Sequence, residues 1–388
     1  MLQQLDPDTK TGDRVAYISI SDVKSFKECR RRWSYRSHLR HNRTPSVTPK
    51  YFARGRAMHS GFAAHYLGNE SPVIAFQREF ERNLLEDIIA RRKVYASSDT
   101  NGAGGFSVTI KDRPDEVFYP FETDVHKVLE SQDYKDDIRI GTEVLKAFIL
   151  WAEANDDYDE IIDIEKRHVV PLIDSDWMAV LPHIPYDRVD YSFKADLVVR
   201  RGNEYWIVDF KTTKHLWTTG YYNHLLVDEQ ISAYTKAAEL IYGLPFVGAI
   251  FVFVRFDEPN APKVLNNGSL SKSRNQKTTA LRYYEEVKAR NLPMHEYADF
   301  IRWLDQNKVW FQRIEAIRSD QEKTVFWEQL KTIAVEMIDP YTMLYPSPQR
   351  VLCENCAWVN PCTVENAGDP ETLKSVLLND YAPNPPRD

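Results

Sequence analysis

The sequence lacks a long apolar run, carries little cysteine and has no excess of positive charge. No apolar segment approaches the roughly 20 residues that a membrane-spanning helix needs, and residues 1–10 do not resemble a signal peptide. We therefore expect a cytoplasmic protein with no membrane partner. The formal net charge of −7 does not by itself indicate nucleic-acid binding, although a negative total is compatible with a local basic patch.

Cysteine is confined to four positions, Cys29, Cys353, Cys356 and Cys362. Disulfides are rare in cytoplasmic proteins, so these thiols are better explained as metal ligands. Three of them fall within ten residues near the C-terminal end, and the fourth lies more than 300 residues upstream. Four thiolates can hold either Zn²⁺ or an iron–sulfur cluster, and the local spacing, with a single C-x2-C element, does not fully separate the two.

The remaining composition is that of a globular protein. Of the 388 residues, 43% are hydrophobic, 12% aromatic and 28% charged, which suits one large domain or two ordinary ones. Outside the motifs discussed below, the apolar periodicities predict a helix from Ser19 or Ser21 to about Arg40, helical segments over Pro72–Tyr134 around a loop at Ser97–Phe106, a helix over Ile140–Glu153, a buried strand over Val247–Arg255, and helices over Thr279–Arg318 and Thr324–Met337.

The most informative stretch runs from Lys194 to Lys211. Two apolar segments flank a polar turn centred on Gly202, and this pattern predicts a β-hairpin. Asp196 falls in the first strand, whereas Asp209 and Lys211 lie near the end of the second. Because residues two apart in a strand point to the same face, we expect Asp209 and Lys211 side by side.

Charges on a buried strand need an explanation, because burying a charge is costly unless it is paired or binds a metal. One interpretation of Asp209 and Lys211 is an ordinary ion pair at a strand end. The other is a catalytic, metal-binding group that includes Asp196.

Two further segments carry polar residues at suggestive spacings. A strand predicted over Ile161–Leu172 contains Glu165 among Ile and Val residues, where an exposed edge position is the alternative. A helix predicted over Tyr222–Tyr242 carries Gln230 and Tyr234, which lie four residues apart and hence on one face.

Two N-terminal segments add to this set. A helix from Arg54 to about Tyr66 carries Gly55 and His59, and a lone His is more often structural than a metal ligand. Between Lys24 and Arg43 there are eight Lys or Arg residues and one acidic residue, interleaved with Trp33 and Tyr35. This basic segment is either a solvated face or a surface that contacts phosphates and stacks on bases. Its candidate nucleic-acid-binding residues are Arg30, Arg31, Arg32, Arg36 and Arg40.

These motifs together resemble the PD-(D/E)XK nuclease superfamily. An Asp, a hairpin and Asp-x-Lys form the core of that superfamily, and Val208-Asp209-Phe210-Lys211-Thr212 is similar to the D-[FY]-K-T strand of its RecB-like branch. The order along the chain is also that of the branch: Cys, G-x-x-x-H, Asp, D-x-K, Q-x-x-x-Y and a Cys trio. Ala195 departs from the pattern, because it stands where a Pro gave the superfamily its name, at a position that varies.

The resemblance implies hydrolysis of phosphodiester bonds with Mg²⁺ or Mn²⁺. The metal ligands that it implies are His59, Asp196, Asp209 and the carbonyl of Phe210. Lys211 would orient water and stabilise negative charge, Gln230 and Tyr234 would position the water or the DNA strand, and Glu165 would lie at the edge of the active site. The implied catalytic set is Asp196, Asp209, Lys211, Gln230, Tyr234 and Glu165, with Tyr234 also near the DNA.

The cysteine layout resembles that of the iron–sulfur nucleases of the same branch, among them the AddB subunit and the CRISPR-associated nucleases of spacer acquisition. The resemblance favours a [4Fe–4S] cluster over zinc, held by Cys29, Cys353, Cys356 and Cys362. Such a cluster would tie the first helix to the last segment of the chain, because metal–ligand bonds contribute folding free energy directly.

The implied fold is α/β, a restriction-endonuclease-like core with a central mixed sheet flanked by helices, helical insertions and an iron–sulfur staple between the two ends. The expected organisation is a flexible N-terminus over 1–18, a single nuclease domain over 19–362 with insertions at about 72–135 and 258–345, and a C-terminal tail over 363–388.

The function expected from the resemblance is a metal-dependent DNA exonuclease acting on single-stranded or end-bearing DNA in recombination, repair or phage replication. Its partners would be DNA and a recombinase, helicase or single-strand-binding protein. One alternative is a non-catalytic DNA-binding or scaffold subunit with the same fold, against which the intact Asp196, Asp209 and Lys211 argue. Another is a nuclease of CRISPR spacer acquisition, for which the chain is long.

Overall fold

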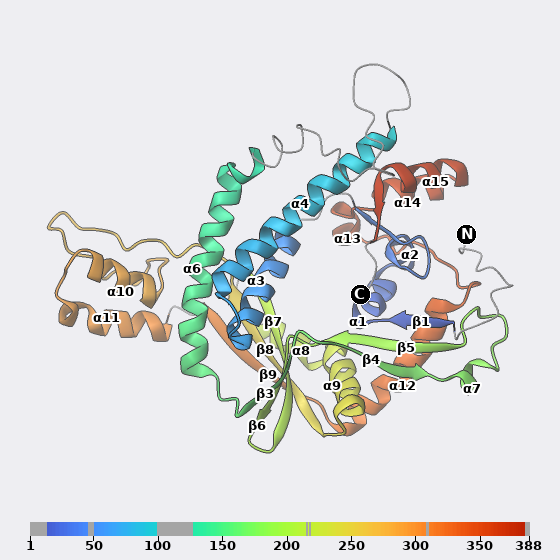
Figure 1. The fold of residues 1–388 in the computed structure, drawn as a ribbon, viewed down its shortest axis with the longest axis horizontal. Coiled ribbons are helices and arrows are strands. Elements are labelled where there is room, and N and C mark those ends of the chain that lie inside the picture. The colour runs from blue at the N-terminus through green and yellow to red at the C-terminus, as the bar shows by residue number, and fades with distance from the viewer. Residues whose placement is uncertain are drawn as a thin grey trace.

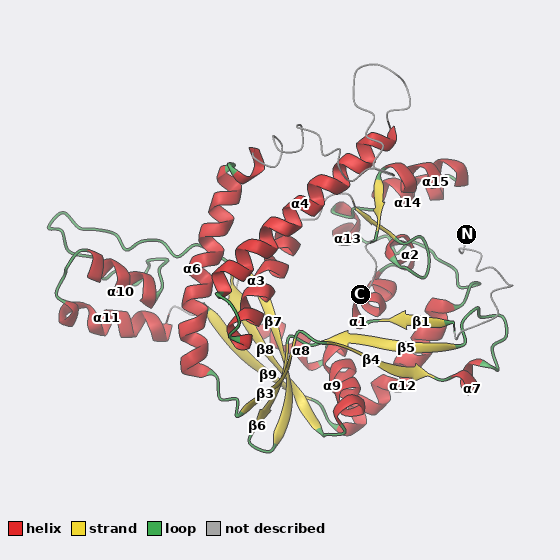
Figure 2. Ribbon diagram, in the orientation of Figure 1, coloured by secondary structure: helices red, strands yellow, loops and turns green. Residues whose placement is uncertain are grey.

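The computed structural model describes residues 14–45, 50–98, 127–214, 216, 219–307 and 310–384. Helices cover both faces of a five-stranded sheet, and a three-stranded sheet lies beside it (Figures 1 and 2). Within the described ranges, no helix is both long and apolar enough to cross a bilayer.

The five-stranded sheet has the strand order β3-β6-β7-β8-β9. Its strands are β3 Glu160–Ile164, β6 Leu197–Arg201, β7 Glu204–Thr213, β8 Phe246–Arg255 and β9 Phe311–Ile317. β7 and β8 run parallel, and the other neighbours are antiparallel. The predicted central mixed sheet flanked by helices is therefore confirmed.

The predicted hairpin is also confirmed. β6 pairs antiparallel with β7, with Leu197 opposite Val208, and Gly202 in the turn has a φ of +61°, which glycine adopts without steric cost. Asp196 differs slightly from expectation, because it lies in the bend directly before β6 rather than within the strand.

The three-stranded sheet has the order β1-β5-β4. Its strands are β1 Val15–Ile18, β5 Arg188–Lys194 and β4 Arg167–Ile173, and the short helix α7 Ser175–Met178 joins β4 to β5. The single strand predicted over Ile161–Leu172 is wrong, since the chain bends at Glu165, whose φ is +51°, and divides into β3 and β4 in different sheets.

The chain thus passes between the two sheets at two points that lie side by side. One passage is at Glu165, between β3 and β4, and the other is at Ala195–Asp196, between β5 and β6. The backbone amide of Glu165 donates to the carbonyl of Asp196 at 2.9 Å, which fixes the two passages together.

Three long helices cover one face of the main sheet: α3 Lys50–Leu67, α4 Pro72–Ser98 and α6 Gln132–Asn155. They bury Phe62 and Phe148 against Phe210 of β7. The helix predicted over Ile140–Glu153 lies inside α6, and the loop predicted at Ser97–Phe106 lies mostly outside the described residues.

The opposite face is covered by α9 Glu229–Tyr242 and α12 Asp320–Ile338, with α1 Ile20–Glu28 beside them. Two predicted helices are each broken in two. The first ends at Cys29, whose backbone is extended with a φ of −161°, and resumes as α2 Arg30–Arg36. The second is divided into α8 Thr219–Leu226 and α9, because the Asp228 side chain caps the N-terminus of α9.

The helix predicted over Thr279–Arg318 is wrong at its C-terminal end. Residues 280–307 form α10 Ala280–Ala289 and α11 Met294–Asn307, which pack on each other and project to the left in Figure 1. Residues 311–317 instead form β9, the edge of the main sheet, because pairing with β8 overrides the helical propensity of Gln, Arg, Glu and Ala there.

The two ends of the described chain pack against each other. The C-terminal elements are α13 Arg350–Glu354, α14 Val359–Asn366, α15 Pro370–Asn379 and β10 Tyr381–Pro383, and β10 pairs antiparallel with β2 Arg43–Pro45. Tyr35 of α2 contacts Trp358, which stacks on Tyr381 at 4.5 Å between ring centroids. Much of the segment assigned to a C-terminal tail is therefore folded onto the N-terminal segment.

Candidate metal centre

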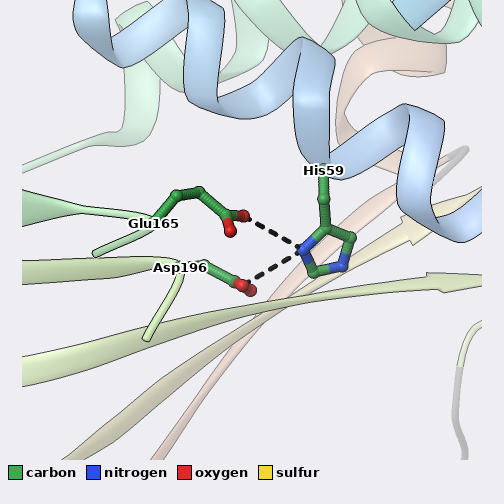
Figure 3. A group of neighbouring side chains, drawn as sticks. All are labelled: His59, Glu165 and Asp196. Carbon is green, nitrogen blue, oxygen red and sulfur yellow. Dashed lines mark hydrogen bonds and ion pairs between the residues drawn. The ribbon is translucent and has the colours of Figure 1, made fainter. Parts of the chain in front are cut away.

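Three side chains converge where the chain passes between the sheets. His59 comes from α3, Glu165 from the bend between β3 and β4, and Asp196 from the bend between β5 and β6 (Figure 3). One ligand atom of each lies within 4.8 Å of the other two. His59 Nδ1 is 3.1 Å from Asp196 Oδ1 and 3.6 Å from Glu165 Oε1.

Hydrogen bonds of the neighbouring residue Asp163 stabilise the turn that carries Glu165. Asp163 Oδ2 accepts a hydrogen bond from Tyr242 Oη at 2.5 Å and lies 3.0 Å from His168 Nε2. These residues flank the turn. Glu165 itself has a left-handed backbone conformation, which is unfavourable for a residue other than glycine, so the surrounding contacts must offset its cost in free energy. Lys194 also forms an ion pair with the Glu165 carboxylate.

His59 and Asp196 form an ion pair that shifts the pKa of both groups. Burial alone would lower the pKa of His59, but the carboxylates of Asp196 and Glu165 outweigh burial and raise this pKa to about 10. Burial would likewise raise the pKa of Asp196, yet the charge of His59 holds it below its usual value. Asp196 Oδ2 accepts the Phe210 amide at 2.6 Å, so this carboxylate is fixed by β7. The imidazolium thus acts as the counter-ion of two carboxylates.

A second charged pair lies next to this group on β7. Lys211 Nζ is 2.5 Å from Asp209 Oδ2, and Gln230 Nε2 of α9 donates to Asp209 Oδ1 at 2.8 Å. Asp209 is only 7% exposed. Burial raises its pKa, against the opposing charge of Lys211, and the charge of the nearby Asp196 raises it further.

Gln230 is itself held in one orientation. Lys24 Nζ of α1 donates to Gln230 Oε1 at 3.4 Å and to Asp228 Oδ1 at 2.8 Å. The Gln230 oxygen therefore faces Lys24, and its NH₂ group faces Asp209.

Tyr234 lies on the same face of α9, with its ring 5.5 Å from that of Phe193. Its pKa is raised far above the usual value by burial and by the negative charges of Asp209 and Asp196.

The structure brings together most of the residues that the sequence indicated. Glu165, expected at the edge of the active site, stands beside His59 and Asp196. Asp209 contacts Lys211 and Gln230, and its role as a metal ligand stays a prediction. The sequence analysis did not identify Lys24, Asp228 or Lys194 as part of the site. Of these three, only Asp228 could have been found from the sequence, because Asp is a favoured residue at the N-cap of a helix.

The arginines of the basic segment mostly bind the protein itself. Arg30 pairs with Glu336, Arg32 with Glu28, and Arg31 contacts the Leu344 carbonyl and Glu365. Arg40 donates to the carbonyls of Met337 and Asp339, and Arg36 is exposed. Their role in DNA binding stays a prediction, and their contacts give four of them a structural function.

The four cysteines lie where the two ends of the chain meet, but their sulfurs do not converge. The Ser347 amide lies 3.5 Å from Cys29 Sγ, and Arg31 Nη1 lies 4.0 Å from Cys362 Sγ. Burial raises the pKa of Cys356, and the nearby thiols Cys29 and Cys353 contribute in the same direction. All four belong to the described part of the chain, and no three of their sulfurs lie within 4.8 Å of one another. The cluster stays a prediction.

The family to which the chain belongs is shown by comparison with protein-family models. The family model described as the PD-(D/E)XK nuclease superfamily matches residues 17–363, which is most of the chain. A search of the curated proteins found no match.

Proposed function

Because the chain belongs to the PD-(D/E)XK nuclease superfamily, we propose that it is a metal-dependent deoxyribonuclease, and more narrowly an exonuclease that acts on single-stranded or end-bearing DNA. The observation that carries this proposal is the joining of two groups at one place: a His–Glu–Asp set suited to a cation, and an Asp–Lys pair beside it. A non-catalytic scaffold would have no need to keep a lysine beside a buried carboxylate at this position.

The donor set fits a divalent cation. His59, Glu165 and Asp196 would hold it, with Asp209 adjacent, and carboxylate oxygens suit Mg²⁺ and Mn²⁺. The carboxylates of Glu165 and Asp196 carry two negative charges at the site, and His59 would release its proton when it binds the ion. When bound, such an ion supplies Lewis acidity and a water of lowered pKa.

The chain's own residues supply positioning and charge. Lys211 keeps its ammonium beside Asp209, and its side chain is 36% exposed, so it can reach both a water and a phosphate oxygen. A fixed ammonium there would stabilise the negative charge that develops on the phosphate during hydrolysis. Gln230 holds Asp209 in place, and Tyr234, one turn along α9, would position the water or the DNA strand.

We assign the iron–sulfur cluster of the RecB-like branch to Cys29, Cys353, Cys356 and Cys362. The surroundings fit a negatively charged group, because Arg31 lies beside Cys362 and a backbone amide beside Cys29. The layout of one N-terminal cysteine and a C-terminal trio, with a single C-x2-C element, supports the cluster over zinc.

The experiment that tests the enzymatic proposal separates cutting from binding. End-labelled single-stranded DNA is incubated with Mg²⁺ or Mn²⁺ and full-length protein purified without air, as wild type, Asp209→Ala and Lys211→Ala. We expect degradation by the wild type alone, together with retained DNA binding by both variants. The position of the surviving label gives the polarity.

A wild-type protein that binds DNA but cuts it with neither metal would contradict the enzymatic proposal and favour the scaffold. The cluster has its own readout in the same preparation, which should be brown and contain about four iron atoms per chain. A colourless protein with one bound zinc would contradict the cluster without affecting the nuclease proposal.

A further inference from the structure

The helix that carries His59 also presents a row of groups suited to a nucleic-acid strand. Phe52, Arg56 and His59 stand at positions i, i+4 and i+7 of α3, so they share one face of the helix. Side chains on a helix lean toward its N-terminus, and the row therefore runs continuously from His59 back toward the start of α3. Figure 3 shows His59 hanging from this helix toward the two carboxylates.

Phe52 is exposed for no reason that the fold supplies. The relative solvent exposure of Phe52 is 54%, and that of its neighbour Tyr51 is 65%. The centroids of the two rings lie 4.4 Å apart. Proteins stack unpaired bases on exposed aromatic rings, since every base offers a flat face.

Gly55 stands between Phe52 and His59 and has no packing role. A methyl group added at its Cα would meet nothing within 4 Å, and its φ is not in the left-handed region. Glycine inside a helix costs about 1 kcal/mol relative to alanine. The contrast with Gly141 is informative, because a methyl group there would collide with the ring of Phe76. At Gly55 the missing side chain leaves the helix backbone open to close approach by a ligand.

Arg56 supplies the charge that such a ligand needs. It is exposed, and it forms no ion pair with any acidic residue in the described ranges. Arg54, one residue before Gly55, is by contrast held by Asp137 and lies over the ring of Phe256. Arg56 is thus an exposed cation on the face of His59, whereas the arginines at positions 30, 31, 32 and 40 are occupied by protein partners.

We propose that this face of α3, formed by Phe52, Gly55 and Arg56, binds the single-stranded segment of the substrate next to the cleaved bond. An unpaired base stacks on Phe52, a phosphate binds Arg56, and the backbone passes over Gly55 toward the metal site at His59. Seven residues of helix span about 10 Å, which corresponds to about three stacked nucleotides. The assignment rests on the proposed nuclease function and adds the path of the strand and the side chains that select unpaired DNA.

The test measures binding rather than cleavage. Fluorescence anisotropy of a labelled oligothymidylate and of a blunt duplex is recorded with Mg²⁺ and full-length protein carrying Asp209→Asn, which prevents degradation. Onto this parent are placed Phe52→Ala, Arg56→Gln and Gly55→Ala, with Arg302→Gln and Tyr341→Leu as matched controls. Arg302 on α11 and Tyr341 are exposed groups of the same chemistry outside α3, with 68% and 78% of their surfaces accessible.

We expect Phe52→Ala to weaken binding of the single strand about tenfold and that of the duplex much less. Arg56→Gln should weaken both and reduce the slope of log affinity against log salt by about 0.7 for the single strand. Gly55→Ala should raise the melting temperature, because alanine favours the helix, and still weaken binding. A loss of binding that accompanies a gain in stability cannot come from misfolding. Both controls should bind like the parent.

The outcomes separate the two proposals. If the parent binds single-stranded DNA and the three variants bind it as tightly, the strand path is wrong and the nuclease function is untouched. The same conclusion follows if Phe52→Ala affects duplex and single strand equally. If the parent binds neither DNA, the proposed function fails and the strand path fails with it.

Discussion

Gln230 shows how single residues of the site depend on partners far away in the sequence. Its amide can face Asp209 with either nitrogen or oxygen, and only nitrogen gives a favourable contact with a carboxylate. Lys24, 206 residues upstream, settles the choice by binding the oxygen. A lysine that never touches the substrate would thus keep Asp209 correctly placed.

Lys24→Met should therefore lower kcat by about three- to tenfold with little change in KM, as is expected when a positioning contact is lost. The same substitution in a Gln230→Ala background should have a smaller effect, because the contact of Lys24 with Gln230 is already lost and only its contact with Asp228 remains. Steady-state cleavage of the four proteins measures this. Lys27→Met is the matched control, since Lys27 lies on the same helix and pairs with Glu229 instead. Equal losses in both backgrounds would mean that Lys24 acts by another route.

Glu165 belongs to the candidate metal-binding set with His59 and Asp196, although the sequence predicted it only at the edge of the active site. Glu165→Gln keeps the shape and removes one charge from the set around His59. We expect the Mn²⁺ concentration for half-maximal cleavage to rise about tenfold, with activity largely restored at high Mn²⁺. An unchanged metal requirement would show that Glu165 is not a ligand.

At the scale of elements, the helices on the α3 face are spaced by small residues. Gly141 of α6 lies against the buried ring of Phe76 of α4, and an added methyl group would stand 2.1 Å from that ring. The two helices can approach this closely only because position 141 has no side chain.

Gly141→Ala should consequently destabilise the protein by about 1–3 kcal/mol, because either the ring or a helix must move. Denaturant unfolding followed by circular dichroism measures the change. Gly55→Ala serves as the control, as it adds the same group in open space, and it should leave stability equal or higher. If Gly141→Ala left the free energy of unfolding unchanged, α4 and α6 would be able to move apart at little cost.

The elements also show what the sequence can and cannot predict. The hairpin of β6 and β7 was predictable, because alternating apolar residues and Gly202 determine it locally, and so was the neighbourhood of Asp196 and Asp209. The contact of His59 with Asp196 joins residues 137 apart and depends on how α3 packs on the sheet. It came from family resemblance rather than from periodicity. The bend at Glu165 gave no signal, since a left-handed conformation is rare for Glu, and β9 was hidden by residues that favour helices.

At the scale of the whole molecule, the first and last segments close on each other beside the nuclease core. Strands β2 and β10 pair, Tyr35 of α2 donates to Glu365 of α14, and Arg31 reaches Asn366. Cys29 lies at the junction of α1 and α2. Because α1 also carries Lys24, this helix connects the packed chain ends with the candidate metal site.

Cys356→Ser should accordingly loosen both ends together if the cysteines hold a cluster. Limited proteolysis should release N-terminal and C-terminal fragments at the same rate, and iron content should fall. Ser347→Ala, which keeps the backbone amide near Cys29, is expected to remain intact and brown. Release of one end without the other would contradict a cluster that joins them.

The central claim is that the side chains between the two sheets form a metal-dependent nuclease centre, and one titration tests it most directly. Cleavage of a labelled single strand is followed over a range of Mn²⁺ concentrations for the wild type and for Asp196→Asn, with equal melting temperatures as the condition for comparison. We predict saturable cleavage by the wild type, none without a divalent ion, and a loss of at least a hundredfold in Asp196→Asn. Cleavage that needs no metal, or that persists in Asp196→Asn, would place the chemistry elsewhere in the molecule.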